Sequence, residues 1–305
     1  MSHFGKLEAD VHLNASAEQM HEILCSNPHH IPNITPTKMK SVTKLQGDWG
    51  KVGSIIVWNY LIDGKSRVTK SVTEAIEPEK NSITYIATEG DILEHNKFFK
   101  LTNEVIPKEK GSAVHLTFEY EKLHSQITDP HYLMQLISEI TRDIDSHLNQ
   151  GQGHNEEHLL GKITVDVHID ASADKFHEML ISKPHLMSNI SPANVQRVSA
   201  DANWGKLGSF FTVYYVQEGK HCVAKDVIHA IDESKKLITL RVVEGDILKD
   251  FKCMDIIIQT TPKEKGSVVH LTFEYEKLKI DIPDPHTLAQ VITHVCRDVG
   301  SHLAL

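Results

Sequence analysis

Histidine and cysteine side chains are the groups in this sequence best suited to metal chemistry. The chain contains 21 histidines and four cysteines among 305 residues. His21-Glu22-x-x-Cys25 resembles part of a zinc-binding helix, in which ligands one turn apart share a face. No set of four Cys and His at the spacing of a zinc site completes it. We therefore expect no metal and no other cofactor.

A glycine-containing stretch, Gly47-x-x-Gly50-x-x-Gly53, has the outward pattern of a phosphate-binding loop. Such a loop binds phosphate where a strand leads into the N-terminus of a helix. Here the sequence predicts a strand on both sides, so the glycines are interpreted as a turn. The formal net charge of −9 provides no basic face to neutralise a nucleic-acid backbone. We expect neither nucleotides nor nucleic acid as partners.

Two histidines recur at equivalent places, His115 and His270, and are the most obvious candidates for proton transfer. The residues on either side of His115 are apolar and alternate with it, so His115 is predicted on the outer face of a sheet. No Ser-His-Asp arrangement, pair of catalytic carboxylates or CxxC motif accompanies these histidines. We therefore assign neither of them a catalytic role.

An internal repeat organises the whole chain. Residues 107–123 read PKEKGSAVHLTFEYEKL and residues 262–278 read PKEKGSVVHLTFEYEKL, so one position in 17 differs at an offset of 155. The polar segment 149–160, NQGQGHNEEHLL, has the composition of a linker. We predict two domains, residues 1–148 and 161–305, joined by that linker.

The cellular location is inferred from what the sequence lacks. The N-terminus has no basic segment followed by an apolar core, and no apolar run approaches the roughly 18 residues that span a bilayer. The cysteines are replaced in the opposite repeat, so no disulfide framework recurs; they are Cys25, Cys222, Cys253 and Cys296. We expect a cytoplasmic protein with reduced thiols and no membrane contact.

Each repeat has the pattern of an α+β domain. Residues 6–13 alternate as a strand, and Ser16 resembles the cap of a short helix over residues 17–25. Residues 39–122 predict strands separated by turns. Asp129 and Pro130 then suit the N-cap and the first position of a long amphipathic helix.

Several segments together resemble the major latex protein branch of the Bet v 1 (pathogenesis-related class 10) superfamily. They read GKLEADVHLNASA, GDWGKVGSIIVWNY, TEGDILE, VHLTFEYEKL and DPHYLMQLISEITRDIDSHL. The resemblance covers nearly all of both repeats and depends on the order and spacing of these motifs. The second repeat has ADANWGKLGSFFTVYY in place of the second motif, so it lacks the first glycine and an equivalent of Trp58.

The resemblance implies two tandem Bet v 1-like (START/helix-grip) α+β domains. Each is expected to be a curved seven-stranded antiparallel sheet around a long C-terminal helix, with two short helices and an apolar cavity. The expected ligand contacts are side chains that the alternation of the strands directs inward, together with residues on the apolar side of the long helix. In the first repeat they are Trp58, Tyr60, Ile83, Tyr85, Leu116, Phe118, Ile137 and Ile140; in the second they are Tyr215, Leu240, Leu271, Phe273, Ile292 and Val295.

The favoured function is that of an intracellular binding or carrier protein for small hydrophobic plant metabolites or hormones, related to defence or stress. The family implies ligands such as sterols, flavonoids, alkaloids, terpenoids and hormones. Apolar burial would supply the affinity and a few hydroxyls the orientation.

Two alternatives remain open. One is a cofactor-free isomerase, lyase or cyclase acting on a reactive intermediate of alkaloid or iridoid-type metabolism, with Tyr85 as candidate catalytic residue. Norcoclaurine synthases of the same superfamily use an inward lysine where this chain has Ile83, which argues against their reaction. The other alternative is an interaction module whose pockets are collapsed.

Overall fold

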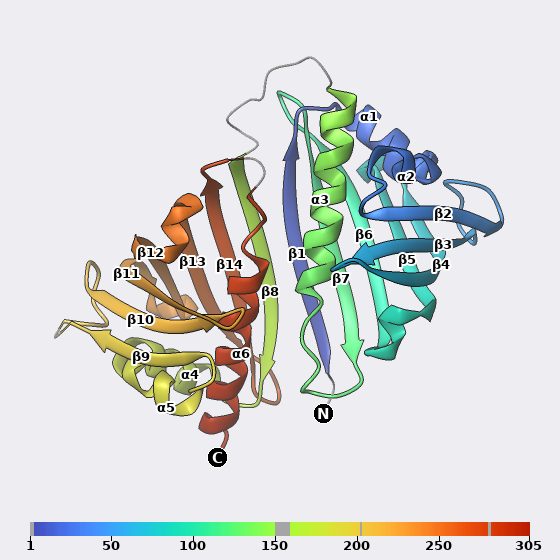
Figure 1. Cartoon of the computed structure of the whole chain (residues 1–305). Helices are drawn as coiled ribbons and strands as arrows, with labels where there is room; N and C mark the ends of the chain where they lie inside the picture. The colour runs from blue at the N-terminus through green and yellow to red at the C-terminus, as the bar shows by residue number, and fades with distance from the viewer. Residues whose placement is uncertain (1–2, 150–158, 202, 280–281) are drawn as a thin grey trace. The chain divides into compact units, whose positions relative to one another are not determined.

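The computed structural model describes residues 3–149, 159–201, 203–279 and 282–305, and the chain divides into two units, Met1–His158 and Leu159–Leu305 (Figure 1). Most of the expected linker, residues 150–158, lies outside the described residues. Leu160, at the end of that expected linker, is already the first residue of a strand. Both units have the predicted α+β architecture.

The first unit is a curved antiparallel sheet with strands in the order β2-β3-β4-β5-β6-β7-β1, and the long helix α3 packs against β1 and β7 (Figure 1). Its strands are β1 (Phe4–Leu13), β2 (Met39–Gln46), β3 (Ile55–Ile62), β4 (Lys65–Glu77), β5 (Ser82–Gly90), β6 (Asn96–Pro107) and β7 (Ser112–Lys122). Its helices are α1 (Ala17–His21), α2 (Ile31–Ile34) and α3 (His131–Leu148), with a π-helical turn at Glu22–Ser26 and 3₁₀ turns at Pro28–His30, Pro78–Lys80 and Asp91–Glu94.

The second unit repeats this arrangement with strands in the order β8-β14-β13-β12-β11-β10-β9. Its strands are β8 (Leu160–Ile169), β9 (Val195–Ala200), β10 (Phe210–Gln217), β11 (Lys220–Asp232), β12 (Leu237–Gly245), β13 (Phe251–Pro262) and β14 (Ser267–Lys277). Its helices are α4 (Ala173–Ser182), α5 (Met187–Ile190) and α6 (His286–Leu303), with 3₁₀ turns at Pro184–Leu186, Glu233–Lys235 and Asp246–Lys249.

The first short helix begins where the sequence predicts. The Ser16 hydroxyl accepts a hydrogen bond from the Gln19 backbone N–H at 3.2 Å, and the Gln19 side chain accepts one from the Ser16 N–H at 3.0 Å. This capping box satisfies two backbone donors that the first turn leaves free. The helix predicted over residues 17–25 is α-helical only to His21 and then widens into the π-helical turn.

A buried polar cluster fixes the start of the long helix in each unit. The Tyr120 hydroxyl donates to Asp129 Oδ1 at 2.7 Å, and Lys122 Nζ lies 3.2 Å from the same oxygen. Gly5 leaves room for the Tyr120 ring, because a Cβ atom there would lie 2.5 Å from it. The helix begins at His131, so Pro130 is the N-cap residue, where the sequence had predicted Asp129. The second unit repeats the cluster with Gly161, Tyr275, Lys277 and Asp284.

Candidate ligand-binding cavities

Each unit contains a cavity between the inner face of its sheet and its long helix. The cavity of the first unit has a volume of about 120 Å³ and is bounded by residues of β2 to β6, α3 and the short helical segments. That of the second unit has a volume of about 110 Å³ and is bounded by the equivalent elements. Most side chains on both walls are aliphatic or aromatic. An apolar cavity of roughly 150 Å³ is large enough to take up benzene.

The structure brings five of the eight predicted contacts of the first repeat together on the cavity wall. These five are Trp58, Tyr60, Tyr85, Ile137 and Ile140. The other three, Ile83, Leu116 and Phe118, are fully buried but lie outside the lining. Leu116 and Phe118 belong to β7, which packs against α3, so their side chains fill the core.

The second unit divides its predicted contacts in the same way. Four of them line the cavity, namely Tyr215, Leu240, Ile292 and Val295. Leu271 and Phe273 lie on β14, the equivalent of β7, and are completely buried outside the lining. Strand alternation, and helical spacing for Ile292 and Val295, place these side chains toward the interior but do not separate the solid part of the core from the hollow part.

The polar groups of the first cavity are partly satisfied within the protein. Trp58 Nε1 donates to Ser71 Oγ at 2.8 Å, and the hydroxyls of Tyr60 and Thr69 lie 3.0 Å apart. The edge of the Trp58 ring system packs on Tyr85, with ring centroids 5.3 Å apart. These contacts hold the aromatic wall of the cavity in one orientation.

Two polar atoms on the same wall have no hydrogen-bond partner in the structure, the Tyr85 hydroxyl and Asn103 Oδ1. The Tyr85 side chain is 5% exposed and that of Asn103 is 6% exposed. Burial raises the pKa of the Tyr85 phenol, so the hydroxyl stays protonated and can donate. The cavity therefore offers one free donor and one free acceptor among apolar side chains. Asn103 is a contact that the sequence did not predict.

The second cavity has a different set of side chains at the matching positions. Where the first unit has Trp58, Thr69, Ser71, Tyr85 and Asn103, the second has Val213, Ala224, Asp226, Leu240 and Ile258. Four of these replacements are apolar, and the fifth introduces a carboxyl group. Asp226 thus adds a carboxyl group to a wall that keeps the Tyr215 hydroxyl, the counterpart of Tyr60 in the first unit.

Asp226 is the functional candidate that the sequence analysis missed. Its side chain lines the cavity, is 3% exposed, and has no hydrogen-bond partner at Oδ1. Desolvation by burial raises its pKa to about 7. The alternation of side chains along β11 could have identified Asp226, because it falls between Ala224 and Ile228 on the inward side of that strand.

A larger hollow of about 490 Å³ adjoins the first cavity, because Tyr60 and Ile92 line both. It lies between the end of β3, the Asp91–Glu94 turn and the segment before α3. Asp91, which lines this hollow, is fixed by two contacts. Its Oδ2 accepts a hydrogen bond from the Val68 N–H at 2.5 Å, and its Oδ1 lies 3.9 Å from Arg67 Nη1.

In the second unit, a hydrogen bond joins β10 to α6. These elements correspond to β3 and α3, which lie on two sides of the hollow in the first unit. Gln217 Nε2, at the end of β10, donates to Thr287 Oγ1 in the first turn of α6 at 2.5 Å. The matching residues of the first unit are Ile62 and Tyr132, which line the hollow. The side chain of Ile62 cannot form such a bond, so the two units differ at this place as well as inside the cavity.

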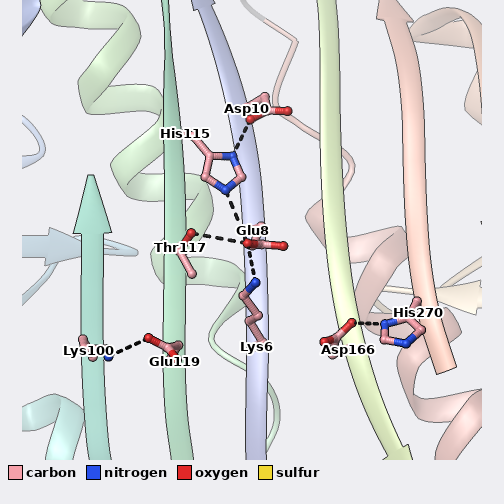
Figure 2. A network of polar contacts seen from close by, with 9 residues as sticks. All are labelled: Lys6, Glu8, Asp10, Lys100, His115, Thr117, Glu119, Asp166 and His270. Carbon is pink, nitrogen blue, oxygen red and sulfur yellow. Dashed lines mark hydrogen bonds and ion pairs between the residues drawn. The ribbon is translucent and has the colours of Figure 1, made fainter. Parts of the chain in front are cut away.

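The recurring histidines belong to polar networks on the outer face of each sheet, as their strand phase predicts (Figure 2). His115 Nδ1 lies 2.6 Å from Asp10 Oδ1, and its Nε2 lies 3.3 Å from Glu8 Oε1. Hydrogen bonds to Asp10 and then Glu8 raise the pKa of His115 to about 9. His270 contacts Asp166 Oδ1 at 2.6 Å. These networks lie on the opposite side of the strands from the cavities.

The part of the chain that the structure describes offers neither a metal site nor a disulfide. Within these ranges, no group of three or more His, Cys, Asp and Glu side chains is placed to hold a metal ion. The four cysteines, from Cys25 to Cys296, are free thiols. None of the described helices combines the length and apolar character needed to cross a bilayer.

Comparison with known proteins identifies the family. The model of the pathogenesis-related protein Bet v 1 family matches twice, over residues 2–151 and 158–305. The chain is 42% identical to MLP-like protein 34 of Arabidopsis thaliana over 304 residues, which cover 98% of this chain and 96% of that protein. It is 41% identical to MLP-like protein 28 of the same plant over 308 residues, which cover 98% of this chain and 92% of that protein.

A solved structure also matches one half of the chain. Ginseng major latex-like protein 151 from Panax ginseng is 33% identical, with a TM-score of 0.47, over 48% of this chain and 99% of the ginseng chain. The two family matches and the near full-length relatives agree with the two units of the structure. The chain belongs to the Bet v 1 family, as a tandem duplication within its major latex protein branch.

Proposed function

We propose that each unit binds a small, mainly apolar molecule in its cavity, so that the chain is a two-site binding or carrier protein. The observation that carries this proposal is the mostly apolar cavity that recurs between sheet and helix in both units. Membership of the Bet v 1 family supports the same role. Apolar cavities with a few convergent polar groups are typical ligand sites.

The energetics favour occupation of these cavities. Side chains around an unfilled space lose dispersion contacts that a ligand would restore, and apolar ligand surface gains about 25 cal/mol per Å² removed from water. In the first cavity, a ligand hydroxyl could accept from the Tyr85 hydroxyl and donate to Asn103 Oδ1, the two atoms without partners. The first unit is therefore suited to a neutral apolar molecule that carries a hydroxyl group.

The proposed ligands are hydrophobic plant metabolites or hormones of the sterol, flavonoid, alkaloid or terpenoid classes, handled in the cytoplasm during defence or stress. Drug-sized ligands ordinarily occupy about 300 Å³ or more. Binding of a molecule that large requires the wall to expand, and the adjoining hollow of about 490 Å³ offers space in the first unit.

One observation favours a second candidate, a cofactor-free isomerase, lyase or cyclase. The Tyr85 side chain lines an apolar cavity and its hydroxyl has no partner, so it can act as a fixed hydrogen-bond donor that stabilises negative charge developing on a substrate more strongly than water would. Leu240 has no such group, so this chemistry would be confined to the first unit. Product formation by the full chain that disappears in a Tyr85→Phe variant would favour the enzyme.

Binding is tested by NMR of the full chain labelled with ¹³C at methionine methyls, because methionines line both cavities. Met39 reports on the first cavity, and Met179 and Met187 report on the second. A panel of sterols, flavonoids, alkaloids and fatty acids should include members that shift these signals saturably. The absence of a saturable shift at all three methionines would contradict the proposal.

Two cavity-filling variants provide matched controls. Ala87→Phe projects a ring into the first cavity and Ala224→Phe into the second. Each should abolish the shifts in its own unit and leave those of the other unit unchanged. Shifts that persist in both variants would indicate binding elsewhere on the surface.

A further inference from the structure

Asp226 occupies a central position on the wall of the second cavity. It lies on β11, opposite Phe211 of β10 and Val242 of β12 in the antiparallel registers, and both of these neighbours also line the cavity. The carboxyl group is therefore surrounded by apolar side chains and directed to the same hollow as they are. A carboxyl group in such surroundings is costly unless it acquires a partner.

The wall supplies no such partner. Besides Asp226, the titratable side chains that line this cavity are Tyr215 of β10 and Cys296 of α6. Burial raises the pKa of both, so neither carries a charge near neutral pH. Among the described residues that form the lining, there is no lysine, arginine or histidine. Oδ1 of Asp226 accepts no hydrogen bond from the protein.

We propose that the second cavity binds a hydrophobic tertiary amine in its protonated form, with the single N–H of the ammonium donated to Asp226. This inference rests on the proposed function, because it assumes that the cavity binds a ligand. A tertiary ammonium has one donor, and its remaining substituents are apolar. It therefore matches a wall with one carboxylate among side chains that are apolar apart from the Tyr215 hydroxyl and the Cys296 thiol. A hydroxyl or primary amine brings further polar atoms that need partners in the same apolar surroundings.

The first unit lacks the group on which this selectivity depends. Ser71 replaces Asp226 there, and its hydroxyl oxygen already accepts a hydrogen bond from Trp58 Nε1 at 2.8 Å. Hence the cation should distinguish the two cavities within one chain. The first cavity provides an internal reference for every measurement.

The test uses two molecules of the same shape, N,N-dimethylbenzylamine and isobutylbenzene, in which an N–H⁺ replaces a C–H. Binding to the full chain is followed at pH 8 through the methyl signals of Met179 and Met187, with Met39 as the reference for the first cavity. The amine should bind the second cavity at least about tenfold more tightly than isobutylbenzene, which is the effect of one charge-assisted hydrogen bond. Asp226→Asn and Asp226→Ser should each lower amine affinity by about tenfold and leave isobutylbenzene binding in place.

The outcomes separate this inference from the function on which it rests. If isobutylbenzene binds the second cavity as tightly as the amine, or if Asp226→Asn leaves amine affinity unchanged, the amine proposal is wrong while binding itself is supported. If neither molecule shifts any of the three methionines, both the amine proposal and the proposed function are contradicted. Two variants are used so that a folding defect in one does not decide the result.

Discussion

The two cavities share one scaffold but differ in the chemistry of their walls. The strand that carries Leu116 and Phe118 is repeated almost unchanged as the strand that carries Leu271 and Phe273, and both strands lie outside the hollow. On the wall itself, hydroxyl, amide and indole groups of the first unit are replaced by aliphatic side chains and one carboxyl group. A single fold can thus provide two sites with different ligand preferences, because the strand beside the long helix is kept while side chains on the cavity wall vary.

The largest effect that would sharpen this comparison is expected from Asp226→Asn. The pKa of Asp226 is about 7 in the folded chain, against about 3.9 when unfolded. Folded protein therefore holds a proton that unfolded protein releases between these values, so stability falls as pH rises from about 4 to about 7 and then levels off. The variant should lack this fall and be more stable than the parent by about 2–4 kcal/mol at pH 8.

Urea unfolding at pH 4, 6 and 8, followed by the methyl signal of the buried Met254 in the second unit, measures this difference. Asp170→Asn is the control, because Asp170 has the same chemistry and lies in the same unit but has an exposed side chain. It should change stability by less than about 0.5 kcal/mol. A parent chain whose second unit keeps the same stability from pH 4 to pH 8 would show that Asp226 is not buried in this way.

The next effect concerns the part of the scaffold that the two units share. Tyr120→Phe and Tyr275→Phe each remove a hydroxyl that donates to a buried aspartate, at 2.7 Å and 2.5 Å respectively. Each should destabilise its own unit by about 1–3 kcal/mol, because a charged acceptor loses a donor. Chemical denaturation should give similar losses in the two units. A large difference between them would break the assumption of a common scaffold.

A smaller, pH-dependent effect is expected on the outer face of the first unit. His115 has a folded pKa of about 9, above its unfolded value of about 6.5. Its ion pairs therefore contribute fully below pH 6.5, and the contribution disappears as pH rises through 9. His115→Gln should cost about 1–2 kcal/mol at pH 6 and much less at pH 10. Equal losses at both pH values would contradict the contacts with Asp10 and Glu8.

The smallest effect tests the hydroxyl preference of the first cavity. Tyr85→Phe should weaken binding of 2-naphthol by about fivefold, near 1 kcal/mol, and leave naphthalene unaffected. Leu240→Phe is the matched change in the second unit and should not discriminate between these molecules. The Met39 signal measures the first affinity and the Met187 signal the second. If Tyr85→Phe weakens the binding of 2-naphthol and naphthalene equally, the Tyr85 hydroxyl does not contact the hydroxyl of 2-naphthol.

Local signals in the sequence predicted an α+β order of strands and helices, and the family resemblance implied the curved seven-stranded sheet around the long helix. Alternation identified Trp58, Tyr60 and Tyr215 as inward, and turn residues separated the strands. Alternation could not show where the core is hollow, since Leu116 on β7 and Tyr85 on β5 have the same inward phase. Whether an inward side chain meets the helix or a cavity depends on the curvature of the whole sheet.

The chemistry of the second cavity was the least predictable part. Asp226 stands beside Lys225 in the sequence, and an aspartate is ordinarily exposed to water. Its inward position follows only from the phase of β11 relative to Ala224 and Ile228. Its lack of a partner depends on side chains from β10, β12 and α6, which are distant in sequence. The absence of a hydrogen-bond partner for Asp226 therefore depends on the folded wall and cannot be predicted from the neighbouring sequence.

The central claim is that both hollows are ligand sites, and a crystal structure of the full chain soaked with iodobenzene tests it most directly. Anomalous scattering locates the iodine without reference to the protein coordinates. We expect one iodine beside Tyr85 and Ile137 and another beside Leu240 and Ile292. Crystals in which wall side chains fill both spaces and no iodine enters either unit would contradict the account.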